Sequence, residues 1–401
     1  MAISTPALVN PNLLAWAREQ SGYAPEPVAK RLSVKVDRFL AWERGARRPT
    51  VRQVEALAKV YHRPFGLFFL PQPPELPPLA AEYRRLPGVK PGVESPELRL
   101  AIRTMSYRRE TATELSEELG TSLPSFRLTA HPSEDPNLVG ARLRAALGVS
   151  IEEQLAWKDE WKAWSRWREA AESVGALVFQ FTKVPLSEVR GVSLFVFPTP
   201  AIGVNSKEGA PGARIYTLAH ELVHLALAAA HEERPALHET RKASDWALLE
   251  RFAEEAASAV IIPRETLSLM LRKVPVARDA WTVDQVRLLA RKFKVTPLAM
   301  ATRLRGEGQF TWAGYERWRG AWDKFVKALP PRSGGFASPI DKTLGRAGRP
   351  LVQLVLEAMD ANRITAVQAS RYLDLRFEHF EGLRSELHER TAVHSGTDFE
   401  S

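Results

Sequence analysis

Apolar and polar positions repeat with the period of an α-helix along most of this chain, and a short central region follows the period of a strand. Residues 11–72 contain five short apolar-faced segments separated by polar turns, which predict five short helices. A longer helix is predicted from about residue 95 to 119, and an aromatic one over 151–173. Three runs typical of strands follow, at residues 176–182, 192–197 and 201–205. The pattern therefore predicts an α+β fold that is mostly helical and has one small sheet.

The helical run at residues 215–226 carries two histidines four positions apart. At 3.6 residues per turn, His220 and His224 lie one above the other on one helix face, with Glu221 beside them. Two neutral imidazoles can hold Zn²⁺, the ion acidifies a bound water, and the adjacent carboxylate can take the proton of that water. The spacing thus predicts a zinc site of the peptidase type. The alternative is a helix with a polar seam, and a third ligand decides between the two.

A second helix supplies candidates for that third ligand. It is predicted to begin at a Ser244 cap and to end before Pro263. Glu250 and Glu254 fall on one face of it. We predict that Glu250 is the third ligand and that Glu254, one turn later, orients a histidine. The reverse assignment of the two glutamates remains open.

Together these two helices resemble a known family. The residues that carry the resemblance are Arg214, the run 216–224, Glu250, Ala253, Glu254, Ala257 and the run 260–263. In this pattern the chain is similar to the ImmA/IrrE metallopeptidases, although Glu254 stands where that family commonly has asparagine. The resemblance implies a zincin-like domain that holds Zn²⁺ through His220, His224 and Glu250, with Glu221 as general base and then proton donor.

Two further parts of a peptidase site are expected near the metal-binding helix. An extended substrate can pair with an edge strand, and the run around Val204 is predicted to be that edge. A donor for the developing oxyanion is also needed. Its candidates by proximity in the sequence are Arg214, Tyr216, His231 and His238.

The first 73 residues hold most of the excess positive charge. They contain eleven Lys and Arg residues against five Asp and Glu residues, a net charge of +6, whereas the whole chain carries +9. The helix, turn, helix order and the run Trp42-Glu43-Arg44-Gly45 before Pro49 resemble the Cro/phage-repressor type of helix-turn-helix domain. The resemblance implies binding to double-stranded DNA, and docking to a protein is the alternative. The predicted contacts, mainly to phosphates, are Lys35, Arg38, Arg44, Arg47 and Arg48.

Composition and breaks in the pattern complete the predicted organisation. The absence of cysteine excludes a disulfide framework and a cysteine nucleophile, and no apolar run is long enough to span a membrane, so we expect a cytoplasmic protein without a membrane partner. Four regions are predicted: a helix-turn-helix domain at 1–73, a linker and helical spacer at 74–140, a metallopeptidase domain at 141–330, and a linker with a small helical unit at 331–401. The last unit is expected to bind a partner or to form a homodimer.

A DNA-binding-like domain joined to a peptidase-like domain indicates regulation rather than digestion. By resemblance, we expect a zinc-dependent endopeptidase that cleaves a specific regulatory protein, such as a repressor, in stress, mobile-element or toxin–antitoxin control. The alternative is a DNA-binding transcriptional regulator or antitoxin-like protein whose metal domain senses or scaffolds without proteolysis. Replacing Glu221 separates the two, because only the first needs that carboxylate for its function.

Overall fold

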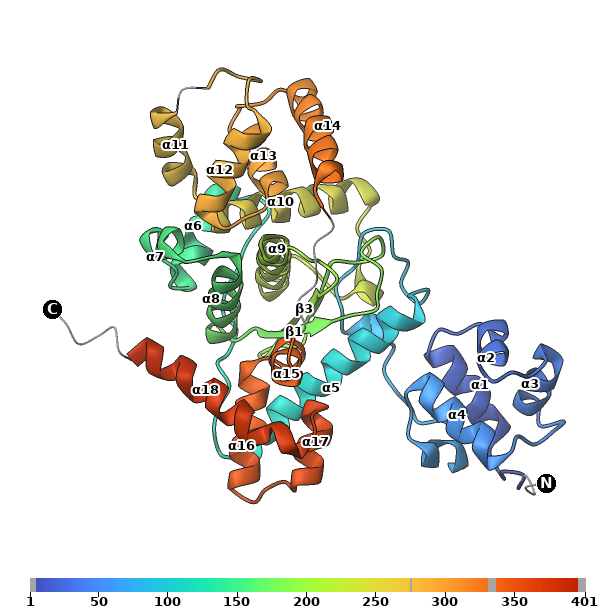
Figure 1. Ribbon diagram of the computed structural model, residues 1–401. Helices are drawn as coiled ribbons and strands as arrows, with labels where there is room; N and C mark the ends of the chain where they lie inside the picture. The colour runs from blue at the N-terminus through green and yellow to red at the C-terminus, as the bar shows by residue number, and fades with distance from the viewer. Residues whose placement is uncertain (1–4, 275, 331–336, 396–401) are drawn as a thin grey trace.

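The computed structural model describes residues 5–274, 276–330 and 337–395, with side chains described as far as residue 387. The chain is mostly helical with one three-stranded sheet, as predicted. In Figure 1 the N-terminal helices form a separate body to one side of a larger body that contains the sheet. Within the described residues, no helix is long and apolar enough to cross a membrane.

The N-terminal body contains four helices and one 3₁₀ turn. They are α1 (Pro11–Gln20), α2 (Pro25–Arg31), α3 (Val36–Glu43), α4 (Val51–Tyr61) and the turn Phe65–Phe69, where a fifth helix was expected. Helix α4 begins at a capping box, in which Thr50 and Gln53 satisfy each other's free backbone N–H groups. A core of its own, with Phe39, Trp42 and Phe68 buried, holds the helices together.

A proline-rich segment without helix or strand connects this body to a long helix. After the 3₁₀ turn Leu79–Ala81 the chain passes beside the sheet and enters α5 (Pro96–Glu118). Ser95 begins α5 as its cap, since its Oγ accepts a hydrogen bond from the Leu98 N–H at 3.1 Å. The predicted long helix is thus confirmed.

The sheet has the order β1-β3-β2, so β3 is its central strand. Its strands are β1 (Leu177–Phe181), β2 (Gly191–Leu194) and β3 (Ala201–Asn205). Strand β3 pairs in parallel with β1 and antiparallel with β2. The prediction that the run around Val204 forms an exposed edge is therefore wrong, because both sides of β3 are already paired. The edge nearest the metal-binding helix is β2.

One face of the sheet packs on the helices that carry the candidate site. The helices on this side are α6 (Pro136–Ala146), α7 (Ile151–Ala156), α8 (Glu160–Ser173), α9 (Pro211–Ala229) and α10 (Ala243–Ile261). The predicted aromatic helix is divided between α7 and α8. Helix α9 contacts β2, β3, α8 and α10, and Val178, Ile202 and Val204 belong to the same core. A further helical group continues this core: α11 (Arg264–Lys273), α12 (Val283–Phe293), α13 (Pro297–Gly306) and α14 (Trp312–Ala328).

The other face of the sheet is covered by α5 and the C-terminal helices (Figure 1). These are α15 (Pro339–Ala347), α16 (Arg349–Asp360), α17 (Ala366–Leu373) and α18 (Phe380–Ser395). Leu177, Phe179 and Phe181 alternate along β1 and point into this second core. The C-terminal unit therefore completes the body that contains the sheet. Of the linker expected at its start, residues 331–336 lie outside the described residues, and a helix begins at Pro339.

Candidate metal centre

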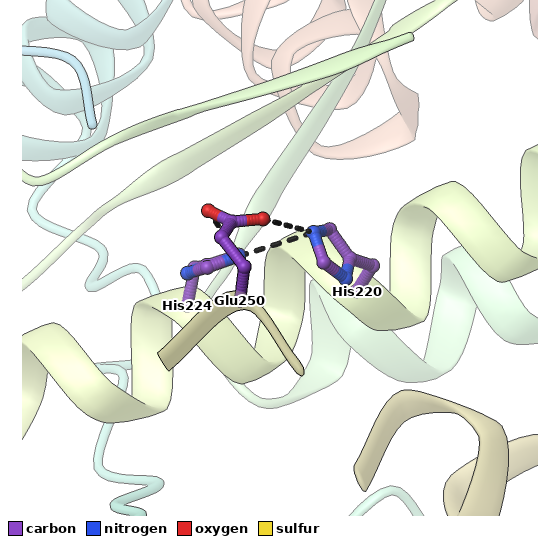
Figure 2. A group of neighbouring side chains, drawn as sticks. All are labelled: His220, His224 and Glu250. Carbon is purple, nitrogen blue, oxygen red and sulfur yellow. Dashed lines mark hydrogen bonds and ion pairs between the residues drawn. The ribbon is translucent and has the colours of Figure 1, made fainter. Parts of the chain in front are cut away.

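Helices α9 and α10 bring three ligand-type side chains together. His220 and His224 lie on one face of α9 with their Nε2 atoms 3.1 Å apart, and the Glu250 carboxylate of α10 faces both (Figure 2). One Glu250 oxygen lies 3.5 Å from His220 Nε2 and the other 3.6 Å from His224 Nε2. All three donor atoms lie within 4.8 Å of one another. The side chains that the sequence predicted as ligands therefore converge on one point.

The donor set fits a zinc ion. Two imidazoles and one carboxylate form a common catalytic zinc set, and the two Nε2 lone pairs that meet here repel unless a cation or a proton lies between them. His224 is also held in the right tautomer, because its Nδ1 lies 2.7 Å from Glu233 Oε2 and both side chains are fully buried. This ring can offer only Nε2 to a metal.

Glu233 replaces Glu254 as the carboxylate that holds a histidine. Glu254 is exposed on α10, and it is its backbone carbonyl that accepts a hydrogen bond, from the Tyr216 hydroxyl at 3.3 Å. The sequence pattern missed Glu233 because it follows the end of α9, where the chain reverses and helical spacing no longer applies. Its position nine residues after His224 offered no periodic signal.

Glu221 lies beside the cluster, and its carboxylate accepts three hydrogen bonds from two side chains. The Ser193 hydroxyl of β2 donates to Glu221 Oε2 at 2.7 Å. Gly191, also in β2, allows this approach, since a Cβ built on it would lie 2.9 Å from Glu221 Oε1. Arg84 donates through Nε to Oε2 at 2.9 Å and through Nη2 to Oε1 at 3.1 Å. Both oxygens of the predicted general base therefore have partners.

Arg84 is a charged residue of the site that the sequence pattern did not predict. Its Nη1 also donates to Glu250 Oε1 at 2.9 Å, so one buried guanidinium bridges the predicted base and a predicted ligand. Burial alone would raise the pKa of both carboxyls, but the Arg84 charge together with the neighbouring His220 and His224 outweighs burial and lowers the pKa of Glu221 and of Glu250. Arg84 lies 137 positions before Glu221, and no motif links them.

The oxyanion candidates separate in the structure. The Tyr216 ring stacks on His220 with 6.4 Å between the ring centroids. Arg214 instead donates to the backbone carbonyls of Glu208 and Ser206, away from the cluster. Of these two candidates, Tyr216 is the one that contacts a predicted ligand.

The predicted DNA-contacting side chains gather around α3. They are Lys35, Arg38, Arg44, Arg47 and Arg48, and all are exposed. Leu40, also on α3, is half-buried and packs against the domain core. The surface around α3 is therefore suited to phosphate contact.

Two regions of the chain match models of known protein families. Residues 171–305, which include β1 to β3, α9 and α10, match the IrrE N-terminal-like domain of the peptidase M78 family. Residues 12–64 match a helix-turn-helix domain. No curated protein matches the chain. Arg84 lies between the two matched regions. The chain therefore carries a helix-turn-helix domain followed by an IrrE N-terminal-like domain of the peptidase M78 family.

Proposed function

We propose that this protein is a DNA-binding regulator with a zinc-dependent endopeptidase activity, and that it cleaves a specific regulatory protein such as a repressor. The observation that carries the proposal is the convergence of His220, His224 and Glu250 beside a buried Glu221. A match to a peptidase family on the same helices adds to it. The helix-turn-helix domain indicates the DNA-binding part.

Each residue of the cluster would have a distinct role. His220, His224 and Glu250 would hold the zinc ion, which when bound would supply an acidified water and polarise the substrate carbonyl. Glu221 would accept the proton of the water and later give it to the leaving amine. Ser193 would keep the Glu221 carboxylate oriented through its hydrogen bond.

The basic surface around α3 would hold DNA through its phosphates. Lys35, Arg38, Arg44, Arg47 and Arg48 are the proposed contacts, because they are exposed and cationic. Binding of this kind positions the protein on a duplex.

The test is metal content by mass spectrometry of the full-length protein purified without chelator, beside Glu250→Ala and Glu254→Ala. We expect about one zinc per chain in the wild type, lost in Glu250→Ala and kept in Glu254→Ala. Wild-type protein that takes up no zinc would refute the peptidase proposal. Glu221→Gln should keep the zinc and lose about 10²-fold or more of proteolysis, since the general base is gone.

One observation favours a second function, in which the metal domain senses or scaffolds without cleaving. Both oxygens of Glu221 already accept hydrogen bonds from Arg84. A general base that is engaged in this way is expected in an inactive enzyme. Under this alternative Glu221→Gln retains regulation in cells, whereas substitution of the arginines around α3 abolishes it. Regulation that is lost in Glu221→Gln while zinc is retained would exclude it.

A further inference from the structure

The edge of β2 next to the candidate metal centre is covered by a segment of the same chain. We name residues 82–84 the strap. The Phe195 N–H donates to the Glu82 carbonyl at 2.7 Å, and the Arg84 N–H donates to the Ser193 carbonyl at 3.0 Å. The strap is thus paired antiparallel with β2, as a fourth strand would be.

The strap is also held from its other side. The Ala236 N–H donates to the Tyr83 carbonyl at 2.7 Å, and Arg84 forms an antiparallel bridge with Pro235. The strap therefore lies in a groove between β2 and the segment that follows Glu233. An extended peptide that binds at a sheet edge is held by backbone hydrogen bonds to the edge strand, and the strap has such bonds to β2 and a further one on its other side.

The side chain of Arg84 extends from the strap into the candidate metal centre. It is 3% exposed and spans Glu221 and Glu250 with three hydrogen bonds. Both oxygens of the Glu221 carboxylate are therefore occupied by the guanidinium of the strap. With the strap in place, the base is engaged and the groove is full.

We propose that the strap is an internal ligand of the peptide-binding groove along β2, and that an extended peptide segment with an arginine side chain displaces it. The arrangement of the strap defines the partner: backbone groups that pair antiparallel with β2, and a guanidinium that reaches Glu221 and Glu250. This deepens the proposed function, because the strap would hold the peptidase closed. Exchange of the strap is itself a binding event and needs no cleavage.

The first experiment removes the Arg84 guanidinium from the protein and supplies it again on a separate peptide. A fluorescein-labelled peptide with the sequence of residues 79–90 is added to full-length wild type, Arg84→Ala and Lys90→Ala, and binding is followed by anisotropy. Lys90 is an exposed cation of the same segment, so its variant is a matched control for the removal of one positive charge. We expect Arg84→Ala to bind the peptide at least about tenfold more tightly than the other two proteins. A peptide in which alanine replaces the residue equivalent to Arg84 should lose that gain.

The second experiment locks the strap in a chain that has no cysteine of its own. Tyr83 and Leu194 face each other as a pair that is not hydrogen-bonded, the type with Cα atoms about 4.5 Å apart, which suits a disulfide. The variant Tyr83→Cys with Leu194→Cys, checked for folding by circular dichroism, should exclude the peptide when oxidised and bind it when reduced. This comparison within one protein decides the question even where Arg84→Ala does not fold.

Equal peptide binding by Arg84→Ala and wild type, or by the oxidised and reduced forms, would overturn the inference. If the protein takes up zinc and cleaves its substrate but does not exchange the peptide, the proposed function is retained and the proposal for the strap is refuted. Peptide exchange in a protein that takes up no zinc would support the proposal for the strap and refute the proposed peptidase function.

Discussion

The close approach of β2 and α9 at Gly191 makes one substitution a sensitive test of the site. A Cβ at position 191 would lie 2.6 Å from Thr217 Cγ2 and 2.8 Å from Glu221 Cγ. Both distances are far inside van der Waals contact. Gly191 is paired with Val204 of the central strand and cannot move outward freely, so the helix side must give way.

We therefore expect Gly191→Ala to act on Glu221 more than on the zinc ligands. Overpacking at a buried position costs about 1–3 kcal/mol of the free energy of unfolding. A shift of about 1 Å in a catalytic group costs about 10²-fold in rate. Zinc content should stay at the wild-type level, because the close contacts involve Thr217 and Glu221 and not the two histidines.

The assay is urea unfolding together with zinc content and the rate of cleavage of the identified substrate. Gly320→Ala is the matched control, because position 320 lies in the exposed part of α14 and an added Cβ meets nothing within 4 Å. That variant should be more stable than wild type by up to about 1 kcal/mol, since alanine is the better helix former. A Gly191→Ala protein as stable and as active as wild type would refute the packing argument.

Three further outcomes follow from the structure. Glu233→Gln should weaken zinc binding about 10- to 100-fold in competition with a chromophoric chelator, because the neutral amide holds His224 less firmly; unchanged affinity would contradict the role of Glu233. The double variant Arg47→Ala with Arg48→Ala should bind DNA with a weaker salt dependence, measured by anisotropy. The slope of log affinity against log salt concentration should fall in magnitude by about 0.9 for each phosphate that the variant no longer neutralises. An unchanged slope would show that these side chains do not contact the DNA. Burial raises the pKa of Glu172 from 4.5 to about 7, despite the opposing Arg168 charge, so the folded protein keeps a proton that the unfolded chain releases. The contribution of Glu172 to stability should therefore be fully present below pH 4.5, fall as the pH rises to about 7 and then level off, and Glu172→Gln should remove this slope in urea unfolding at each pH.

The sequence revealed the parts of the site that lie on single helices. His220, Glu221 and His224 are neighbours on one helix face, so their spacing alone places them together. Glu250 was predicted from the helical pattern of a second segment, and the contact of α9 with α10 brings it to the histidines. These predictions needed only local periodicity and one helix-to-helix contact.

The parts that the sequence missed depend on how distant segments cross. Arg84 reaches Glu221 because the segment before α5 pairs with β2, and strand pairing leaves no periodic mark on the residues that pair. Val204 was misplaced for the same reason, since the order of strands in the sheet is set by the connections between them. The Pro, Gly and Ser composition before residue 349 also concealed α15, which begins with Pro339 in its first turn.

The second core beneath the sheet determines how this chain can be divided. The region that matches the peptidase family begins at residue 171 and stops at 305, yet Phe179 and Val192 of its strands are buried in one core with residues of α5 and α16, which lie outside it on either side in the sequence. A fragment cut at the family boundaries would expose an apolar sheet face to water and should aggregate rather than fold. The region shared with the family and the unit that folds are therefore different pieces of this protein, and the proline-rich segment connects the helix-turn-helix domain to the longer one.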